Sequence, residues 1–77
     1  MKKLNGEVLR HLRLRAGMTQ GQLQEKSGVT DVTIHAIEQN RVGSIKDDTL
    51  MKLAKGLDMD PVELDAKLHV DVQDGVA

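Results

Sequence analysis

Apolar residues recur along the chain at helical spacing, in five short segments that glycine, proline and capping residues separate. These segments cover residues 6–16, 19–27, 30–39, 44–57 and 60–68. The residues expected on their buried faces are Leu9, Leu12, Ala16, Leu23, Ile34, Ile37, Leu50, Leu53, Ala54, Leu57, Leu64 and Leu68. The pattern predicts an all-α domain of five helices over residues 1–68, followed by a tail over residues 69–77.

Residues that cap helix N-termini begin four of these segments. Thr19 and Gln22 have the spacing of a capping box, in which each side chain accepts a hydrogen bond from the other residue's backbone. The other expected caps are Thr30, Ser44 with Asp47 three residues on, and Asp60 with Pro61 and Glu63. In the tail, the alternating residues 69–72 either fray or add a short strand in a dimer, so the tail is expected to be flexible or to contact a second copy.

The composition excludes several classes of protein. The chain has no cysteine and no aromatic residue, which excludes disulfides, thiolate metal sites and nucleic-acid binding by base stacking on aromatic rings. No apolar run approaches the roughly 20 residues that span a bilayer, so we expect a cytoplasmic protein without membrane contact. The three histidines lack metal-ligand spacing, and the sequence shows no Ser nucleophile elbow, no Gly-rich phosphate loop and no paired-carboxylate pocket. We therefore expect neither an enzyme nor a cofactor or metal.

Charge is divided unevenly between the two halves of the chain. Residues 1–46 hold eight Lys and Arg against four Asp and Glu, a net charge of +4, whereas residues 47–77 hold three lysines against eight acidic residues, a net charge of −5. A dipolar molecule of this kind can face phosphate with its positive half. The alternative interpretation is that the charges are distributed over a small surface without functional meaning.

Two capped segments, 19–27 and 30–39, are separated only by a turn containing Gly28. This is the pattern of a helix-turn-helix, whose second helix enters the major groove of DNA. The residues around it are Leu9-Arg10-x-Leu12-Arg13-x-x-Ala16-Gly17-Met18-Thr19-Gln20-x-x-Leu23, Gly28-Val29-Thr30-x-x-Thr33-Ile34-x-x-Ile37-Glu38-x-x-Arg41, Thr49-Leu50-x-x-Leu53-Ala54 and Pro61-x-Glu63-Leu64. Over residues 8–65 the chain thus resembles the Cro/CI-like (XRE) helix-turn-helix family.

The resemblance implies a five-helix domain that binds double-stranded operator DNA, often as a homodimer, through a recognition helix over residues 30–39. It places Asp31, Val32 and Ala36 against base edges, and Thr33 and His35 are the other outward positions. His35 is expected to donate a hydrogen bond, more strongly when protonated. Candidate phosphate contacts are Thr19, Gln20, Thr30, Gln39, Asn40, Arg41 and Lys46. Similar proteins also pair the positions of Arg13 and Glu38 in a structural ion pair.

Some of these assignments have plain structural alternatives. The alternative for Asp31 is that it only stabilises the positive end of its helix, and the alternative for Gln20 is solvated helix surface. The outward positions include no Arg, Lys, Gln or Asn, the side chains that make the best bidentate contacts to guanine or adenine. We therefore expect one subunit to recognise its DNA sequence only weakly, so that dimerisation is needed for a useful operator complex.

The sequence as a whole predicts a sequence-specific transcriptional repressor that acts as a homodimer on a two-fold symmetric operator. The candidate dimer contacts are Leu57, Met59, Val62, the C-terminal helix and the tail, and we expect no small-molecule effector domain. The alternative is a protein-interaction module with the same fold and weak DNA binding, such as an antitoxin or a phage accessory factor.

Overall fold

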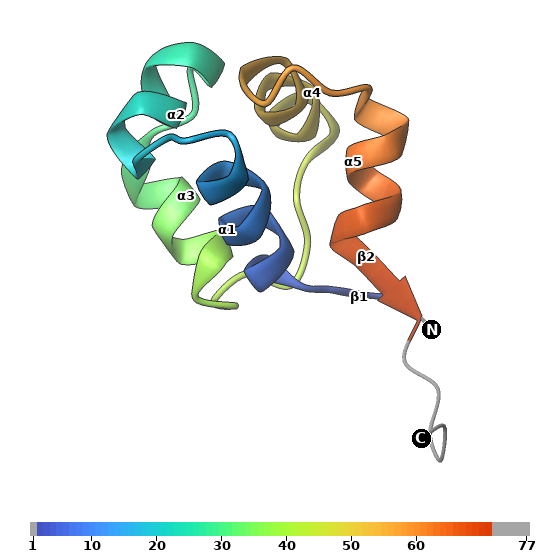
Figure 1. The fold of residues 1–77 in the computed structure, drawn as a ribbon. Helices are drawn as coiled ribbons and strands as arrows, with labels where there is room; N and C mark the ends of the chain where they lie inside the picture. Colours follow the sequence, from blue (N-terminus) through green and yellow to red (C-terminus); the bar gives the residue numbers. More distant parts are fainter. Residues whose placement is uncertain (1, 72–77) are drawn as a thin grey trace.

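The five expected helices are present in the computed structural model, which describes residues 2–71 of the chain (Figure 1). They are α1 (Gly6–Arg15), α2 (Gln20–Ser27), α3 (Asp31–Glu38), α4 (Asp47–Gly56) and α5 (Pro61–Leu68). Two short strands, β1 (Lys2–Leu4) and β2 (His69–Asp71), flank them. The all-α prediction is confirmed for the body of the domain. None of the helices within residues 2–71 is long and apolar enough to cross a bilayer.

Local side-chain chemistry fixes most of the helix starts. Thr19 and Gln22 form the predicted capping box, with Thr19 Oγ1 accepting from the Gln22 N–H at 3.1 Å and Gln22 Oε1 accepting from the Thr19 N–H at 2.8 Å. Thr30 caps α3 and Asp60 caps α5. The expectation for α4 was wrong, because Ser44 lies outside the helix.

The N-cap of α4 is Lys46, which makes no side-chain capping hydrogen bond. The carboxylates of Asp47 and Asp48 lie in the first turn of α4 instead. Negative side chains there interact favourably with the positive end of the helix dipole. The start of α4 is therefore stabilised by the charge of these two carboxylates, whereas capping hydrogen bonds stabilise the starts of the neighbouring helices.

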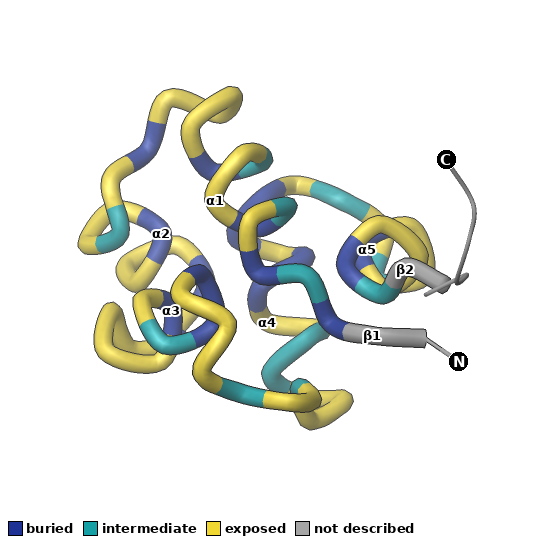
Figure 2. The backbone as a smooth tube through the Cα atoms, turned by 90° about the horizontal axis from the view of Figure 1, so that it is seen from below, coloured by how far each residue is buried: buried dark blue, intermediate teal, exposed yellow. Residues whose placement is uncertain are grey.

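Seven fully buried aliphatic side chains, drawn from all five helices, form the centre of the core (Figure 2). They are Leu9, Leu23, Ile34, Ile37, Leu53, Leu64 and Leu68. Burying each one contributes about 1.5–3 kcal/mol relative to leaving it in water. Two sequence predictions were wrong here. Ala16 is exposed because it is the C-cap of α1, and Leu57 is buried in the chain's own core, which removes it as a dimer contact.

Two glycines allow helices to approach closely. A Cβ at Gly6 would overlap the carbonyl oxygen of Ile37, so the start of α1 lies directly against the end of α3. A Cβ at Gly56 would lie 2.7 Å from the Cβ of Ser27 and 3.0 Å from Leu23 Cδ1. The end of α4 therefore packs against α2, which keeps α4 behind the helix pair α2–α3.

The two strands join the beginning and the end of the described chain. They pair antiparallel, with Lys2 opposite Asp71 and Leu4 opposite His69, and the Asn5 N–H donates to the Leu68 carbonyl at 2.7 Å. Fraying from residue 69 was therefore wrong for residues 69–71, because these residues pair with β1 of the same chain. Contact of the tail with a second copy stays a prediction. The rest of the predicted tail, residues 72–77, lies outside the described residues.

Candidate nucleic-acid interface

The turn between α2 and α3 is held by hydrogen bonds from both sides. Gly28 adopts a left-handed conformation (φ 82°), and its N–H donates to the Gln24 carbonyl at 2.8 Å. The Ser27 hydroxyl donates to the Leu23 carbonyl at 2.6 Å and accepts from the Val29 N–H at 3.1 Å. Because Ser27 and Val29 are both buried, the turn is fixed in one conformation.

The N-terminus of α3 is capped from within the chain. Gln24 Oε1 accepts from the Asp31 N–H at 2.7 Å, and Thr30 Oγ1 accepts from the Thr33 N–H at 3.3 Å. Thr30 is a candidate phosphate contact, but these two N–H groups at the start of its helix are already hydrogen-bonded within the chain. At the start of α2, by contrast, the N–H groups of Gln20 and Gly21 have no partner among the described residues, which makes that terminus the better anion site.

A buried ion pair joins α1 to α3. Arg13 Nε lies 2.8 Å from Glu38 Oε2, its Nη2 donates to Oε1 at 3.0 Å, and its Nη1 donates to the Met18 carbonyl at 2.8 Å. The two side chains are only 9% and 1% exposed. This is the pair that the sequence led us to expect, with the loop before α2 added as a third partner.

Burial and pairing compete in setting the charge of Glu38. Burial raises the pKa of its carboxyl group, but hydrogen bonds from Arg13 and Gln20 and the positive charges of Arg13 and Arg10 outweigh it, so the pKa lies below its ordinary value of 4.5. The hydrogen bond to Glu38 raises the pKa of Arg13, against the effect of burial. Both groups are therefore charged at neutral pH.

Gln20 connects this ion pair to the surface of α3. Its Nε2 donates to Glu38 Oε1 at 3.1 Å and lies 3.4 Å from Nδ1 of His35. Sequence reasoning missed both contacts. The partners are 18 and 15 residues away, so no local spacing could indicate them.

The expected reading face of α3 is open to solvent. Asp31, Thr33 and His35 are exposed, Val32 is 75% exposed, and Ala36 is half-buried. Figures 1 and 2 both place α2 and α3 on the opposite side of the molecule from α5. The chain's own later helices therefore leave this face uncovered, as insertion into a groove requires.

Half of the expected contact residues surround one shallow hollow of about 370 Å³. It is lined by Gln20, Asp31, Val32, His35, Ala36 and Arg41. Thr33 instead borders a separate hollow of about 300 Å³, together with Lys46. The structure thus brings the base-reading candidates together with two of the phosphate-binding candidates, and sets Thr33 and Lys46 apart from them.

The remaining phosphate candidates differ in how free their polar groups are. Thr19 is exposed, but its hydroxyl is engaged in the capping box. Asn40 has a left-handed backbone (φ 59°), and its Oδ1 accepts from the Gly6 N–H at 2.8 Å, which leaves the amide nitrogen to donate. Gln39 and Arg41 are exposed at the end of α3.

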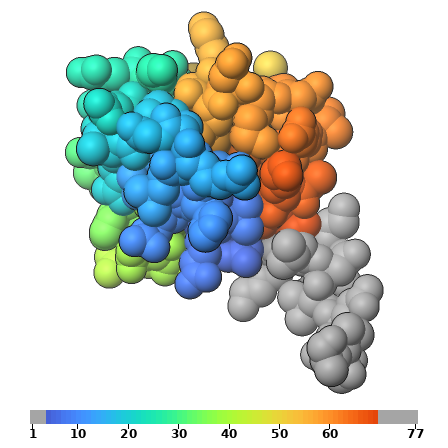
Figure 3. Space-filling view, viewed as in Figure 1, coloured from blue at the N-terminus to red at the C-terminus, as the bar shows by residue number. Residues whose placement is uncertain are grey.

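The positive and negative halves of the sequence also occupy different parts of the fold. The positive first half of the chain forms α1, α2 and α3, and the negative second half forms α4 and α5. In Figure 3 the atoms of α1 and α2 cover one side of the visible face and those of α4 and α5 cover the other. The hollow on α3 therefore belongs to the positive half.

A model of the helix-turn-helix domain matches residues 6–66, which include α1 to α4 and all of α5 except its last two residues. The chain belongs to the helix-turn-helix domain family. This confirms the family resemblance that the motifs between Leu9 and Leu64 indicated. Comparison with curated protein sequences gives no match.

Solved structures of two restriction-modification controller proteins resemble this helix-turn-helix chain along most of its length. C.AhdI from Aeromonas hydrophila is 32% identical, with a TM-score of 0.70 over 77% of this chain and 88% of its own. Wild-type C.Esp1396I is also 32% identical, with a TM-score of 0.67 over 77% of this chain and 75% of its own. The likeness extends beyond the helix pair to the arrangement of the whole domain.

Proposed function

We propose that this helix-turn-helix protein is a sequence-specific DNA-binding regulator of transcription, a repressor of the controller type, and not an enzyme. The observation that carries the proposal is the hollow on α3, where Val32 is 75% exposed among the other expected reading residues. An aliphatic side chain so exposed beside a fixed turn suits contact with a thymine methyl group in the major groove. Such a protein acts where the DNA is, so we propose that it works in the cytoplasm.

The docking that we propose uses the two helices differently. The N-terminus of α2, with the open N–H groups of Gln20 and Gly21, faces a backbone phosphate. The exposed side of α3 then lies in the major groove, which is about 12 Å wide and admits a helix. Val32 and Ala36 meet thymine methyl groups, Asp31 accepts from cytosine N4, and Arg41 contacts the backbone at the other end of α3.

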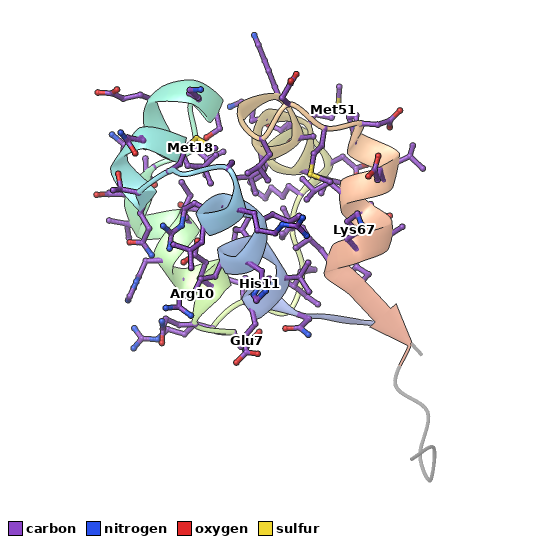
Figure 4. All side chains as sticks on the ribbon, in the orientation of Figure 1. Glu7, Arg10, His11, Met18, Met51 and Lys67 are labelled. Carbon is purple, nitrogen blue, oxygen red and sulfur yellow. The ribbon has the colours of Figure 1, made fainter. Side chains whose placement is uncertain are left out.

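A homodimer is part of the proposal, because one subunit offers few strong base contacts. Among the described residues of the second half, the large apolar side chains that are exposed are Met51 on α4, 59% exposed, and Val62 on α5, 77% exposed, and Met59 is partly buried between the two helices. Figure 4 shows Met51 at the α4–α5 side, away from α3. Pairing two copies there leaves both recognition helices free to enter successive major grooves about 34 Å apart.

The similarity to C.AhdI and C.Esp1396I supports the finer part of the proposal. Both are controller proteins of restriction-modification systems, and the chain covers at least three quarters of each. We therefore propose that this protein controls genes of the same kind.

Selection from a random duplex pool, followed by binding measurements on variants, tests the proposal. Arg41→Ala should weaken binding to every sequence and flatten the dependence of affinity on salt, because a phosphate contact is lost. Lys67→Ala, which removes the same charge from α5, is the matched control and should change affinity little. Val32→Ala should change the selected sequence instead.

The rival is a protein-interaction module, and the exposed Asp31 on α3 favours it, since a carboxylate repels phosphate. A log–log salt slope near zero on random duplex, together with no enriched sequence after selection, would favour that rival and refute the DNA-binding proposal.

A further inference from the structure

His35 lies at the margin between the recognition surface and the buried ion pair. It is an exposed residue of α3 that lines the same hollow as Val32 and Ala36, and its ring nitrogen Nδ1 lies 3.4 Å from Gln20 Nε2. The other ring nitrogen, Nε2, has no hydrogen-bond partner among the described residues. Nδ1 thus contacts the protein's own Gln20, and Nε2 is available to bind a ligand.

The ion pair determines which end of the Gln20 amide faces inward. Glu38 is ionised, because Arg13 bonds both of its oxygens, and a carboxylate can only accept hydrogen bonds. The atom of Gln20 that lies 3.1 Å from Glu38 Oε1 must therefore be the donor, the amide nitrogen. The reverse orientation would place the amide oxygen against a buried negative charge.

The orientation of Gln20 in turn determines the proton position on His35. An amide nitrogen donates and does not accept, so the ring nitrogen beside it must be the acceptor. In a neutral imidazole only one nitrogen accepts, and the proton then resides on the other. A doubly protonated ring would point an N–H at the amide hydrogens of Gln20.

We propose that His35 is a specificity-determining residue that reads DNA as a neutral imidazole, donating from Nε2–H to an acceptor on a purine edge, while Gln20 is the positioning residue that selects this tautomer. The inference rests on the proposed function and deepens it. Purine N7 is the acceptor that adenine and guanine share, and guanine O6 adds a second beside it. Thymine O4 is also an acceptor, so the 7-deaza test below is needed to identify the base as a purine, whereas cytosine presents only a donor in the major groove and is rejected at this position. This replaces the expectation that protonation strengthens the contact of His35.

The tautomer can be measured without DNA. Two-bond ¹⁵N–¹H correlation spectra of the imidazole rings at about pH 8.5, where an imidazole of ordinary pKa is neutral, should show His35 wholly in the Nε2–H form. His11, exposed on α1 without a side-chain partner among the described residues, is the internal control and should show a mixture of tautomers (Figure 4). In Gln20→Ala, His35 should become a mixture like His11. A mixture at His35 in the wild type, or no change in Gln20→Ala, overturns the proposal.

The base contact is tested on the sequence that selection yields. Replacing each purine singly by its 7-deaza analogue removes the N7 acceptor and leaves Watson–Crick pairing intact. One position in each half-site should lose about fivefold to tenfold in affinity, the worth of one net hydrogen bond. In His35→Ala, which is weaker overall, the same replacement should cost nothing further.

The two experiments separate the possible failures. A deaza penalty that persists in His35→Ala, or no penalty at any purine, overturns the contact even if the protein binds DNA as proposed. Absence of DNA binding overturns the proposed function itself, whatever the tautomer of His35. If the tautomer is as expected but no purine is read through it, the proposed role in specificity is wrong.

Discussion

Removing Arg13 should leave the carboxylate of Glu38, the most deeply buried charge among the described residues, without its cationic partner. The Glu38 side chain is 1% exposed, and Arg13 supplies both of its charge-assisted hydrogen bonds as well as a third bond to the Met18 carbonyl. In Arg13→Met the aliphatic volume is largely kept, but Glu38 retains only the amide of Gln20. Breaking a buried pair by removing one partner typically costs about 3–5 kcal/mol.

That cost is large for a chain of 77 residues. At about 0.05–0.15 kcal/mol per residue, the whole domain has about 4–12 kcal/mol of stability. Arg13→Met should therefore remove roughly a quarter to all of the unfolding free energy. The double variant Arg13→Met, Glu38→Met removes the stranded charge too, and replacing both partners of a buried pair with apolar residues is often neutral or stabilising.

Urea unfolding followed by far-ultraviolet circular dichroism measures these differences, since the chain has no aromatic residue to provide fluorescence. With a slope near 1 kcal/mol per molar urea, usual for small domains, the midpoint of Arg13→Met should fall by about 3 M or the protein should be unfolded in buffer. The double variant should recover at least half of the loss. A single variant within about 1 kcal/mol of wild type, or a double variant as unstable as the sum of the two single ones, contradicts the reasoning.

Three further predictions concern stability. The pKa of Glu38 is lowered by folding, so its ionised form stabilises the protein above the ordinary carboxyl pKa of 4.5 and loses that effect as pH falls through the lower folded value. The gap in unfolding free energy between wild type and Glu38→Gln should be constant from pH 7 to about 5 and then narrow, and a gap that widens toward acid contradicts this sign. Gly56→Ala should cost about 1–3 kcal/mol in the same urea assay, because its Cβ would crowd Ser27, whereas Gly43→Ala, with nothing nearby, is the control. Ser27→Ala should cost about 1–3 kcal/mol by leaving the buried Val29 N–H without an acceptor, and an unchanged midpoint would show that the hydroxyl does not hold the turn.

The sequence could predict those structural features that depend on residues close together in the chain. Thr19 with Gln22, and Gly28 at the turn, act over three or four residues, and the structure has them as predicted. The buried face of α3 likewise follows from the spacing of Ile34 and Ile37. These features together indicated the helix-turn-helix and its family.

What it could not predict depends on pairs brought together by the fold. Ser44 has the chemistry of a cap, yet α4 begins at Asp47, three residues later. β1 pairs with residues almost seventy positions away, and a segment of three residues has no periodicity of its own to reveal a strand. At the site, the link from Gln20 to Glu38 and His35 exists only because the turn at Gly28 folds the start of α2 against α3. The identity of each side chain was available in advance, but its partner was not.

The pairing of β1 with β2 makes the domain a nearly closed loop of chain. Lys2 and Asp71 are opposite each other, and antiparallel partners have Cα atoms about 4.5–5.5 Å apart. A short engineered turn between them could therefore join the ends, and new ends could be opened at Gly43, which is exposed between α3 and α4. In such a circular permutant, the new connection between β1 and β2 would lie on the side of α5 (Figure 1). The same holds for two copies linked in tandem at these strands. In both cases α3, the helix that faces the groove, would remain unobstructed in each copy.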